Sequence, residues 1–159
     1  MTVEFEIAYV LGRDVGPGEV VADPLSVVAE TRVAFELVLS RFVDRRVVGW
    51  PSFAADNAAF EALVLGPAID GTAIAGIAET LVVEADGIEK ARIATGDDAV
   101  VPVDGLADLL AIARDRGMVL PRGSIVSTGT ISVPFNLTGA AQITARYLDR
   151  DLHVSIMRP

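Results

Sequence analysis

The chain lacks cysteine altogether and has a single histidine in 159 residues. Without cysteine there can be no disulfide framework, thiolate zinc site, iron–sulfur cluster or cysteine nucleophile. A serine–histidine–aspartate relay would depend on His153, six residues from the C-terminus, and a metal motif with two histidines is impossible. Any metal site must therefore be built from oxygen ligands.

Basic residues are also scarce. The chain has 13 lysines and arginines against 22 acidic residues, which gives a formal net charge of -9. Binding to a phosphate backbone requires clustered basic side chains. We therefore expect no nucleic-acid partner.

No segment has the composition of a membrane span, although the mean hydropathy is high at +0.48. Residues 123–145 carry no charge and exceed the length of about 20 residues that a span needs, but glycine, proline, serine and threonine interrupt them throughout. No basic segment followed by an apolar one opens the chain, since Glu4 and Glu6 come at once. These features predict no membrane association and a cytoplasmic location.

Hydrophobic periodicity predicts many short strands with two or three helices inserted between them. Strands are expected at residues 3–11, 33–39, 63–65, 80–85, 88–95, 124–130, 142–147 and 152–157, and a tight hairpin turn at Asp86-Gly87. Helices are expected at residues 24–31 after the N-cap Asp23, at residues 52–60 after Ser52, and at residues 105–116 before Gly117. Residues 1–159 should form one β-rich α+β domain.

Carboxylates occur at positions where a strand can gather them. Glu4 and Glu6 are two residues apart in the first strand, so both leave the same face, with Cα atoms about 6.5 Å apart. For such a pair alone, a solvated strand face is the usual interpretation. However, that face continues as Ala8 and Val10, and Glu36 lies in an apolar strand where an unpaired carboxylate would be costly to bury. Three such acids would together suit Mg²⁺ or Mn²⁺.

Several segments resemble, in order, the fumarylacetoacetate hydrolase superfamily, in particular its 2-keto-4-pentenoate hydratase and 4-oxalocrotonate decarboxylase branch. Residues 4–14 are similar to its E-x-E-I-A-F-V-L-G-R-D segment, residues 34–41 to A-[LI]-E-I-V-D-S-R, and residues 55–58 to A-D-N-A. Residues 87–96 resemble its N-G-E-x-V-x-x-G hairpin and residues 117–130 its G-L-x-L-x-x-G-D-I-V-L-T-G-S segment. The resemblance covers nearly the whole chain.

The resemblance implies a β-roll of mixed sheets, usually dimeric, that holds one divalent metal, Mg²⁺ or Mn²⁺, on Glu4, Glu6 and Glu36. The metal would chelate the carboxylate and carbonyl of a 2-oxo acid or its enol and stabilise the enolate. Hydration, decarboxylation, carbon–carbon cleavage and keto–enol isomerisation all pass through such an intermediate. Thr128 and Gly129 match the segment that borders the substrate carboxylate, although the pair alone would suggest a turn at a strand end.

Four further residues are candidates for the chemistry. Asp56 and Glu61 could move protons, as could a metal-bound water, while Asp56 could instead only cap a helix. Arg13 and Arg41 could anchor a substrate carboxylate, or form structural ion pairs with Asp14 and Asp44.

The chain departs from the branch in ways that leave three hypotheses open. The branch has an N-terminal segment that supplies a lysine, whereas this chain begins three residues before Glu4 and its only lysine, Lys90, lies in the expected hairpin. Leu39 stands where the branch has aspartate. The chain could be a minimal metal-dependent lyase, a hydratase or decarboxylase. It could instead catalyse isomerisation or cyclisation of a larger apolar substrate, or be a non-catalytic subunit whose missing segment a partner chain supplies.

Overall fold

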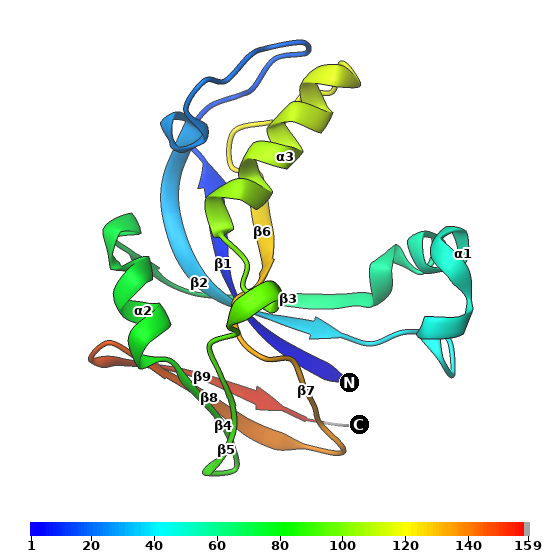
Figure 1. Cartoon of the computed structure of the whole chain (residues 1–159), viewed down its shortest axis with the longest axis vertical. Helices are drawn as coiled ribbons and strands as arrows, with labels where there is room; N and C mark the ends of the chain where they lie inside the picture. Colours follow the sequence, from blue (N-terminus) through cyan, green and yellow to red (C-terminus); the bar gives the residue numbers. More distant parts are fainter. Residues whose placement is uncertain (158–159) are drawn as a thin grey trace.

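Two antiparallel sheets and three α-helices make up the computed structural model, which describes residues 1–157 (Figure 1). The first sheet has the order β3-β2-β1-β6, with β7 beside the start of β1, and the second has the order β5-β4-β8-β9. The first sheet consists of β1 (Thr2–Leu11), β2 (Val28–Val38), β3 (Phe60–Ile69), β6 (Ile125–Thr130) and β7 (Phe135–Asn136). The second consists of β4 (Val82–Ala85), β5 (Ile88–Arg92), β8 (Ala141–Tyr147) and β9 (Arg150–Ile156). The helices are α1 (Gly49–Ala55), α2 (Ile74–Thr80) and α3 (Pro102–Asp115).

The hydrophobic core lies between the two sheets. Alternate residues of β1 point into it, so Val3, Phe5, Ile7 and Tyr9 are all buried. Phe5 packs edge-on against Phe35 of β2, with ring centroids 5.4 Å apart, and lies 5.8 Å from the ring of Tyr147 on β8. The even-numbered residues of β1, which include Glu4 and Glu6, therefore leave its other face.

The predicted α+β fold and several of its elements are confirmed. The strand expected at residues 3–11 is β1, and the hairpin turn has the left-handed conformation of a type I′ turn, with φ of 51° at Asp86 and 76° at Gly87. Helix α3 ends at Asp115, and Gly117 follows with a φ of 62°. These features depend on local signals, which the sequence displays directly.

Two helix predictions were wrong in extent, because part of each segment pairs as a strand. The helix expected at residues 24–31 is only the single 3₁₀ turn Pro24–Val27, since β2 starts at Val28 and pairs with β1 from there. The helix expected at residues 52–60 is Gly49–Ala55 instead. Residues 57–59 all have positive φ, which ends the helix, and Phe60 already pairs with Val38. Helix α2 and strand β7 were not predicted.

The expectation of mixed sheets was also wrong, because every strand pair among residues 1–157 is antiparallel. Most neighbours in a sheet are consecutive strands, and such connections reverse the chain direction. No helix in residues 1–157 has the length and apolar content to cross a membrane.

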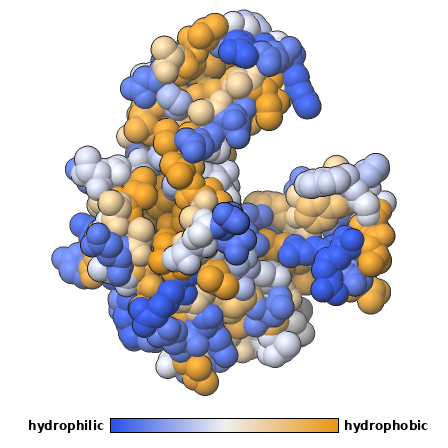
Figure 2. All heavy atoms as spheres, in the orientation of Figure 1, coloured by the Kyte–Doolittle hydropathy of each residue, from blue (hydrophilic) through white to orange (hydrophobic). Residues whose placement is uncertain are grey.

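Strands β2 and β3 extend beyond the body and carry residues 39–59, here called the arm, out to one side (Figure 1). The buried carboxylate of Asp56 holds the base of the arm together. It accepts hydrogen bonds from Ser40 Oγ at 2.6 Å, from the Arg41 backbone N–H at 3.1 Å and from the Arg41 guanidinium at 2.8 Å. An open hollow separates the arm from the lobe that contains α3 (Figure 2).

Candidate metal centre

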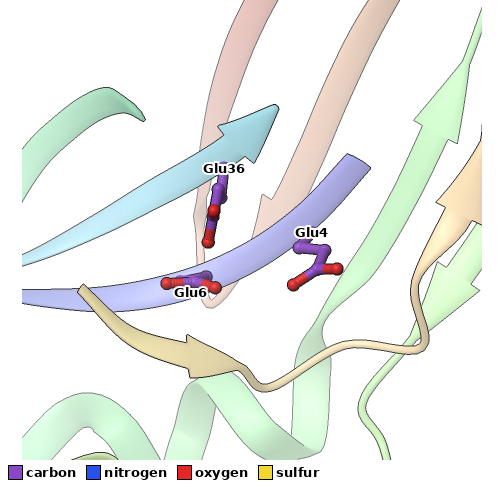
Figure 3. Close-up of side chains that lie close together, drawn as sticks. All are labelled: Glu4, Glu6 and Glu36. Carbon is purple, nitrogen blue, oxygen red and sulfur yellow. The ribbon is translucent and has the colours of Figure 1, made fainter. Parts of the chain in front are cut away.

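Three glutamates converge on the face of the first sheet that points away from the core (Figure 3). Glu4 and Glu6 come from β1, and Glu36 on β2 is the direct cross-strand partner of Glu4. One carboxylate oxygen from each lies within 4.8 Å of those of the other two. The structure thus brings together the three residues that the resemblance assigns to a metal.

Glu6 is the buried member of this cluster. Its Oε2 accepts hydrogen bonds from Ser127 Oγ and from the Gly129 backbone N–H, the latter at 3.3 Å. Its Oε1 is buried and has no hydrogen-bond partner in residues 1–157. Burial and the neighbouring Glu36 raise the pKa of Glu6 from 4.5 to about 8, against the lowering effect of the Ser127 hydrogen bond. A buried acceptor without a donor calls for a further ligand.

An irregularity in β6 brings the Gly129 N–H to Glu6. Glu6 pairs with Thr130 and Ala8 with Ser127, so two residues of β6, Thr128 and Gly129, lie opposite Ile7 alone. Gly129 has a φ of 91°, which favours glycine. Thr128 Oγ1 donates to the Ile7 carbonyl at 2.8 Å, so this hydroxyl stabilises the bulge.

Glu4 and Glu36 are half-buried and open onto a pocket of about 500 Å³. Burial and the facing Glu36 raise the pKa of Glu4, while Arg45 acts in the opposite direction. A cation bound between the carboxylates of Glu4 and Glu36 would relieve their mutual repulsion. Three carboxylates within this span fit a hard divalent ion, whose oxygen ligands stand about 4 to 5 Å apart across the ion. The residues present therefore fit the predicted group.

The arm supplies the opposite wall of this pocket. Arg45, Arg46, Trp50 and Phe53 line it together with the two glutamates. Arg46 forms an ion pair with Asp44, with N–O distances of 2.9 and 3.0 Å. Arg45 has no carboxylate within 4.0 Å in residues 1–157, although its charge acts on Glu4. Sequence analysis did not identify Arg45, and the one available signal was two adjacent arginines ahead of Trp50.

The remaining predicted residues lie outside the glutamate cluster. Arg13 follows the far end of β1, about 20 Å along the strand from Glu6, and pairs with Glu19 at 2.7 Å. Arg41 pairs with Asp56 at 2.8 Å, and the hydrogen bonds from Ser40 and Arg41 hold the pKa of Asp56 below its usual value. Glu61 is exposed on β3 and is not part of the pocket wall with Glu4. Both arginines do form structural ion pairs, but with Glu19 and Asp56 instead of the expected Asp14 and Asp44.

No family model and no curated protein sequence matches this chain. Solved structures do match it. One is 4-oxalocrotonate decarboxylase from Pseudomonas putida G7, complexed with magnesium and adipate, with a TM-score of 0.75 and 24% identity over 98% of this chain and 59% of that one. A fumarylacetoacetate hydrolase family protein from Yersinia pestis CO92 has a TM-score of 0.64 and 16% identity over 98% of this chain and 73% of that one. Fumarylpyruvate hydrolase from Pseudomonas aeruginosa, in complex with Mn²⁺ and pyruvate, has a TM-score of 0.58 and 14% identity over 98% and 65%.

These likenesses define the fold. The chain has the fold of the fumarylacetoacetate hydrolase superfamily, which confirms the fold that the sequence resemblance predicted. It spans 59% of the length of the decarboxylase.

Proposed function

We propose that the protein is a divalent-metal-dependent enzyme of the 2-oxo acid lyase type, a hydratase or a decarboxylase. The observation that carries this proposal is the buried, unpartnered Oε1 of Glu6 beside the carboxylates of Glu4 and Glu36. The magnesium in the similarly folded decarboxylase and the Mn²⁺ in the hydrolase support it.

Glu4, Glu6 and Glu36 would hold Mg²⁺ or Mn²⁺. A bound divalent ion would supply Lewis-acid stabilisation of the negative charge that develops on the carbonyl oxygen of a 2-oxo acid. Ser127 and the Gly129 N–H fix the orientation of the Glu6 carboxylate, so this ligand is held before any ion arrives. Glu4 and Glu36 face the pocket from which ion and substrate would enter.

The pocket also suits an anionic substrate. Its volume of about 500 Å³ is in the range of small-molecule sites. Arg45 is the one lining cation in the described residues that no carboxylate neutralises, and it lies near Glu4. We assign it to the substrate carboxylate, in the role that the sequence suggested for Arg13 and Arg41. Thr128 and Gly129 remain candidates for the border of that carboxylate.

We assign proton transfer to Asp56 and Glu61. The lowered pKa of Asp56 restricts it to acting as a base, and its three donors compete with a substrate. Glu61 is free in solvent at the start of β3. Loss of turnover with intact metal binding in Glu61→Gln or Asp56→Asn would support the assignment, and full turnover in both would refute it.

Thermal unfolding tests the metal site. Mg²⁺ or Mn²⁺ should raise the melting temperature, because a ligand at a hundred times its Kd stabilises the folded state by about 2.7 kcal/mol. Glu6→Gln and Glu36→Gln should abolish the rise. Glu79→Gln is the matched control, since this exposed helix residue has no ion pair within residues 1–157. Equal shifts in all four proteins would refute the proposal.

The reaction is tested with purified protein, Mg²⁺ and either oxaloacetate or a 2-oxo-4-enoic acid, with the Glu36→Gln protein under identical conditions as the blank for metal-catalysed loss in solution. Loss of carbon dioxide or gain of water would identify a decarboxylase or a hydratase. A product of unchanged mass would instead indicate isomerisation or cyclisation. No turnover with either substrate, together with turnover after a co-purifying chain is added, would favour the partner-dependent subunit.

We also propose that the protein is a homodimer. Large apolar side chains are exposed along the arm, with Val43 fully exposed and Val47 and Trp50 each 79% exposed. Light scattering should give twice the chain mass of 16.7 kDa. Val43→Glu should shift the protein to monomer, and a wild-type monomer at micromolar concentration would contradict this proposal.

A further inference from the structure

Two residues that carry hydroxyl groups lie side by side on the core side of the first sheet. Tyr9 on β1 and Thr31 on β2 are direct cross-strand partners, on the face opposite to the glutamate cluster. Their side chains belong to the buried set, with 1% and 9% of their surface exposed. Neither hydroxyl has a hydrogen-bond partner within residues 1–157. Neither oxygen is among the buried, unpartnered side-chain atoms of the described residues, so each hydroxyl reaches solvent and can bond a further group.

Both residues line a separate pocket of about 320 Å³. The pocket lies between the end of β1, the start of β2, the end of β3 and the segment that leads into α2. Most of its walls are apolar and include Leu25, Val28, Ile69 and Ile74.

Gly71 keeps the Thr31 hydroxyl accessible. A Cβ at this position would lie 3.6 Å from Thr31 Oγ1, at ordinary contact distance, and so would cover it. The glycine does not have a positive φ, so the chain conformation does not require glycine here. The absence of a side chain leaves space directly over the hydroxyl.

The charge of the pocket selects against anions. Glu30 is its one charged lining residue, and this carboxylate is paired with Arg32 at 2.6 Å. The described lining residues include no basic side chain. The pocket therefore offers no counter-charge to an anionic 2-oxo acid.

We propose that this pocket is a second binding site, for a small neutral molecule with an apolar body and one oxygen, such as a phenol or a ketone. The Tyr9 hydroxyl donates to the ligand oxygen, and Thr31 Oγ1 donates to it or accepts from it. The apolar walls bury the rest of the ligand. The site shares β1 with Glu4 and Glu6 but lies on the other face of the strand, so it is distinct from the candidate metal centre.

Fluorine NMR titration with 4-fluorophenol tests the proposal on the full chain. Fluorobenzene, which lacks the oxygen, and 4-fluorobenzoate, which is anionic, are the matched probes. The phenol should saturate the protein and bind at least threefold more tightly than fluorobenzene, and the benzoate should not compete. Equal affinity of phenol and fluorobenzene, or no saturable binding, would overturn the proposal and leave ordered water as the partner of the two hydroxyls.

Three variants locate the binding. Tyr9→Phe and Thr31→Val preserve shape and should each weaken 4-fluorophenol binding threefold to tenfold, while fluorobenzene binding stays unchanged. Gly71→Val should block the pocket and abolish binding of both probes. Glu6→Gln, on the other face, should bind the phenol like wild type. Circular dichroism confirms folding of each variant, and phenol binding that survives in folded Gly71→Val would refute this location.

Discussion

Glu4 on β1 lies directly opposite Glu36 on β2, with no basic side chain within ion-pairing distance of either in the described residues. Like charges in cross-strand positions destabilise a sheet by a few tenths to about 1 kcal/mol. The protein thus gives up stability at the place where a divalent cation would restore it. This relationship distinguishes a metal site from a solvated strand face. The repulsion lowers the stability of the metal-free protein, and a bound cation would raise it.

Replacing Glu36 with glutamine should therefore stabilise the metal-free protein by about 0.5 to 1 kcal/mol, since it removes the repulsion with Glu4. The same variant should lose the stabilisation by Mg²⁺. Urea denaturation in EDTA and in excess Mg²⁺ measures both effects. A variant less stable than wild type in EDTA would show that a hydrogen bond from protonated Glu6 to Glu36 outweighs the repulsion with Glu4.

The raised pKa of Glu6 predicts how stability depends on pH. In the metal-free protein, folding favours the protonated carboxyl, so the folded state binds more protons than the unfolded state between about pH 4.5 and pH 8. Stability should fall as pH rises through this window, with a slope that approaches about 1.4 kcal/mol per pH unit. Urea denaturation of wild type and Glu6→Gln in EDTA measures it, and the variant should be much flatter.

Saturating Mg²⁺ should also flatten the profile, because it favours the ionised carboxylate. The stabilisation by Mg²⁺ should consequently increase with pH up to about 8. An effect of Mg²⁺ that is independent of pH would contradict coordination by Glu6.

Arg45 and Arg46 offer a matched pair, because they are adjacent and only Arg46 has a carboxylate partner. Arg45→Gln should bind Mn²⁺ about threefold more tightly, since it removes a positive charge that acts on Glu4. In saturating Mg²⁺ it should bind oxalate, a mimic of a 2-oxo acid, about tenfold more weakly.

Arg46→Gln should change both constants little. Calorimetric titration measures them. Parallel weakening of metal and oxalate binding in Arg45→Gln would indicate a structural role for Arg45 instead of contact with the substrate.

Tyr147 predicts a stabilising substitution in the core. Its side chain is fully buried, and its hydroxyl has no partner within residues 1–157. Tyr147→Phe retains the contact with Phe5 and should be neutral or stabilise the protein by up to about 1 kcal/mol. Urea denaturation tests this, with an unchanged Mg²⁺ effect as the control for the distant site. A loss above 1 kcal/mol would show that an ordered water satisfies the hydroxyl.

Local signals predicted much of the fold and part of the site. The period of two in β1 placed Glu4 and Glu6 on one face, and Asp86-Gly87 defined its own hairpin. Glu36 was a candidate because its strand is apolar, but its position opposite Glu4 depends on the register of two strands separated by a long connection.

The residues that sequence analysis missed depend on contacts between distant segments. Ser127 reaches Glu6 across 121 positions, through a bulge that its own sequence does not reveal. Arg45 lines the same pocket as Glu4 only because the arm forms a wall of that pocket. Arg41 was proposed to bind a substrate. Its observed partner Asp56 is 15 residues away, and the two come together only when the arm folds.

Gly129 and Gly123 permit a last test of the bulge in β6. Both have positive φ, 91° and 82°, so alanine at either position should cost about 1 to 2 kcal/mol of backbone strain. Only Gly129 donates its N–H to Glu6. Alanine keeps the N–H but disfavours the φ that directs it at Glu6, so Gly129→Ala should displace this donor and weaken Mn²⁺ binding about tenfold, whereas Gly123→Ala should leave it unchanged at similar stability. Equal Mn²⁺ affinity in the two variants would mean that the bulge shapes the strand without orienting the Glu6 carboxylate.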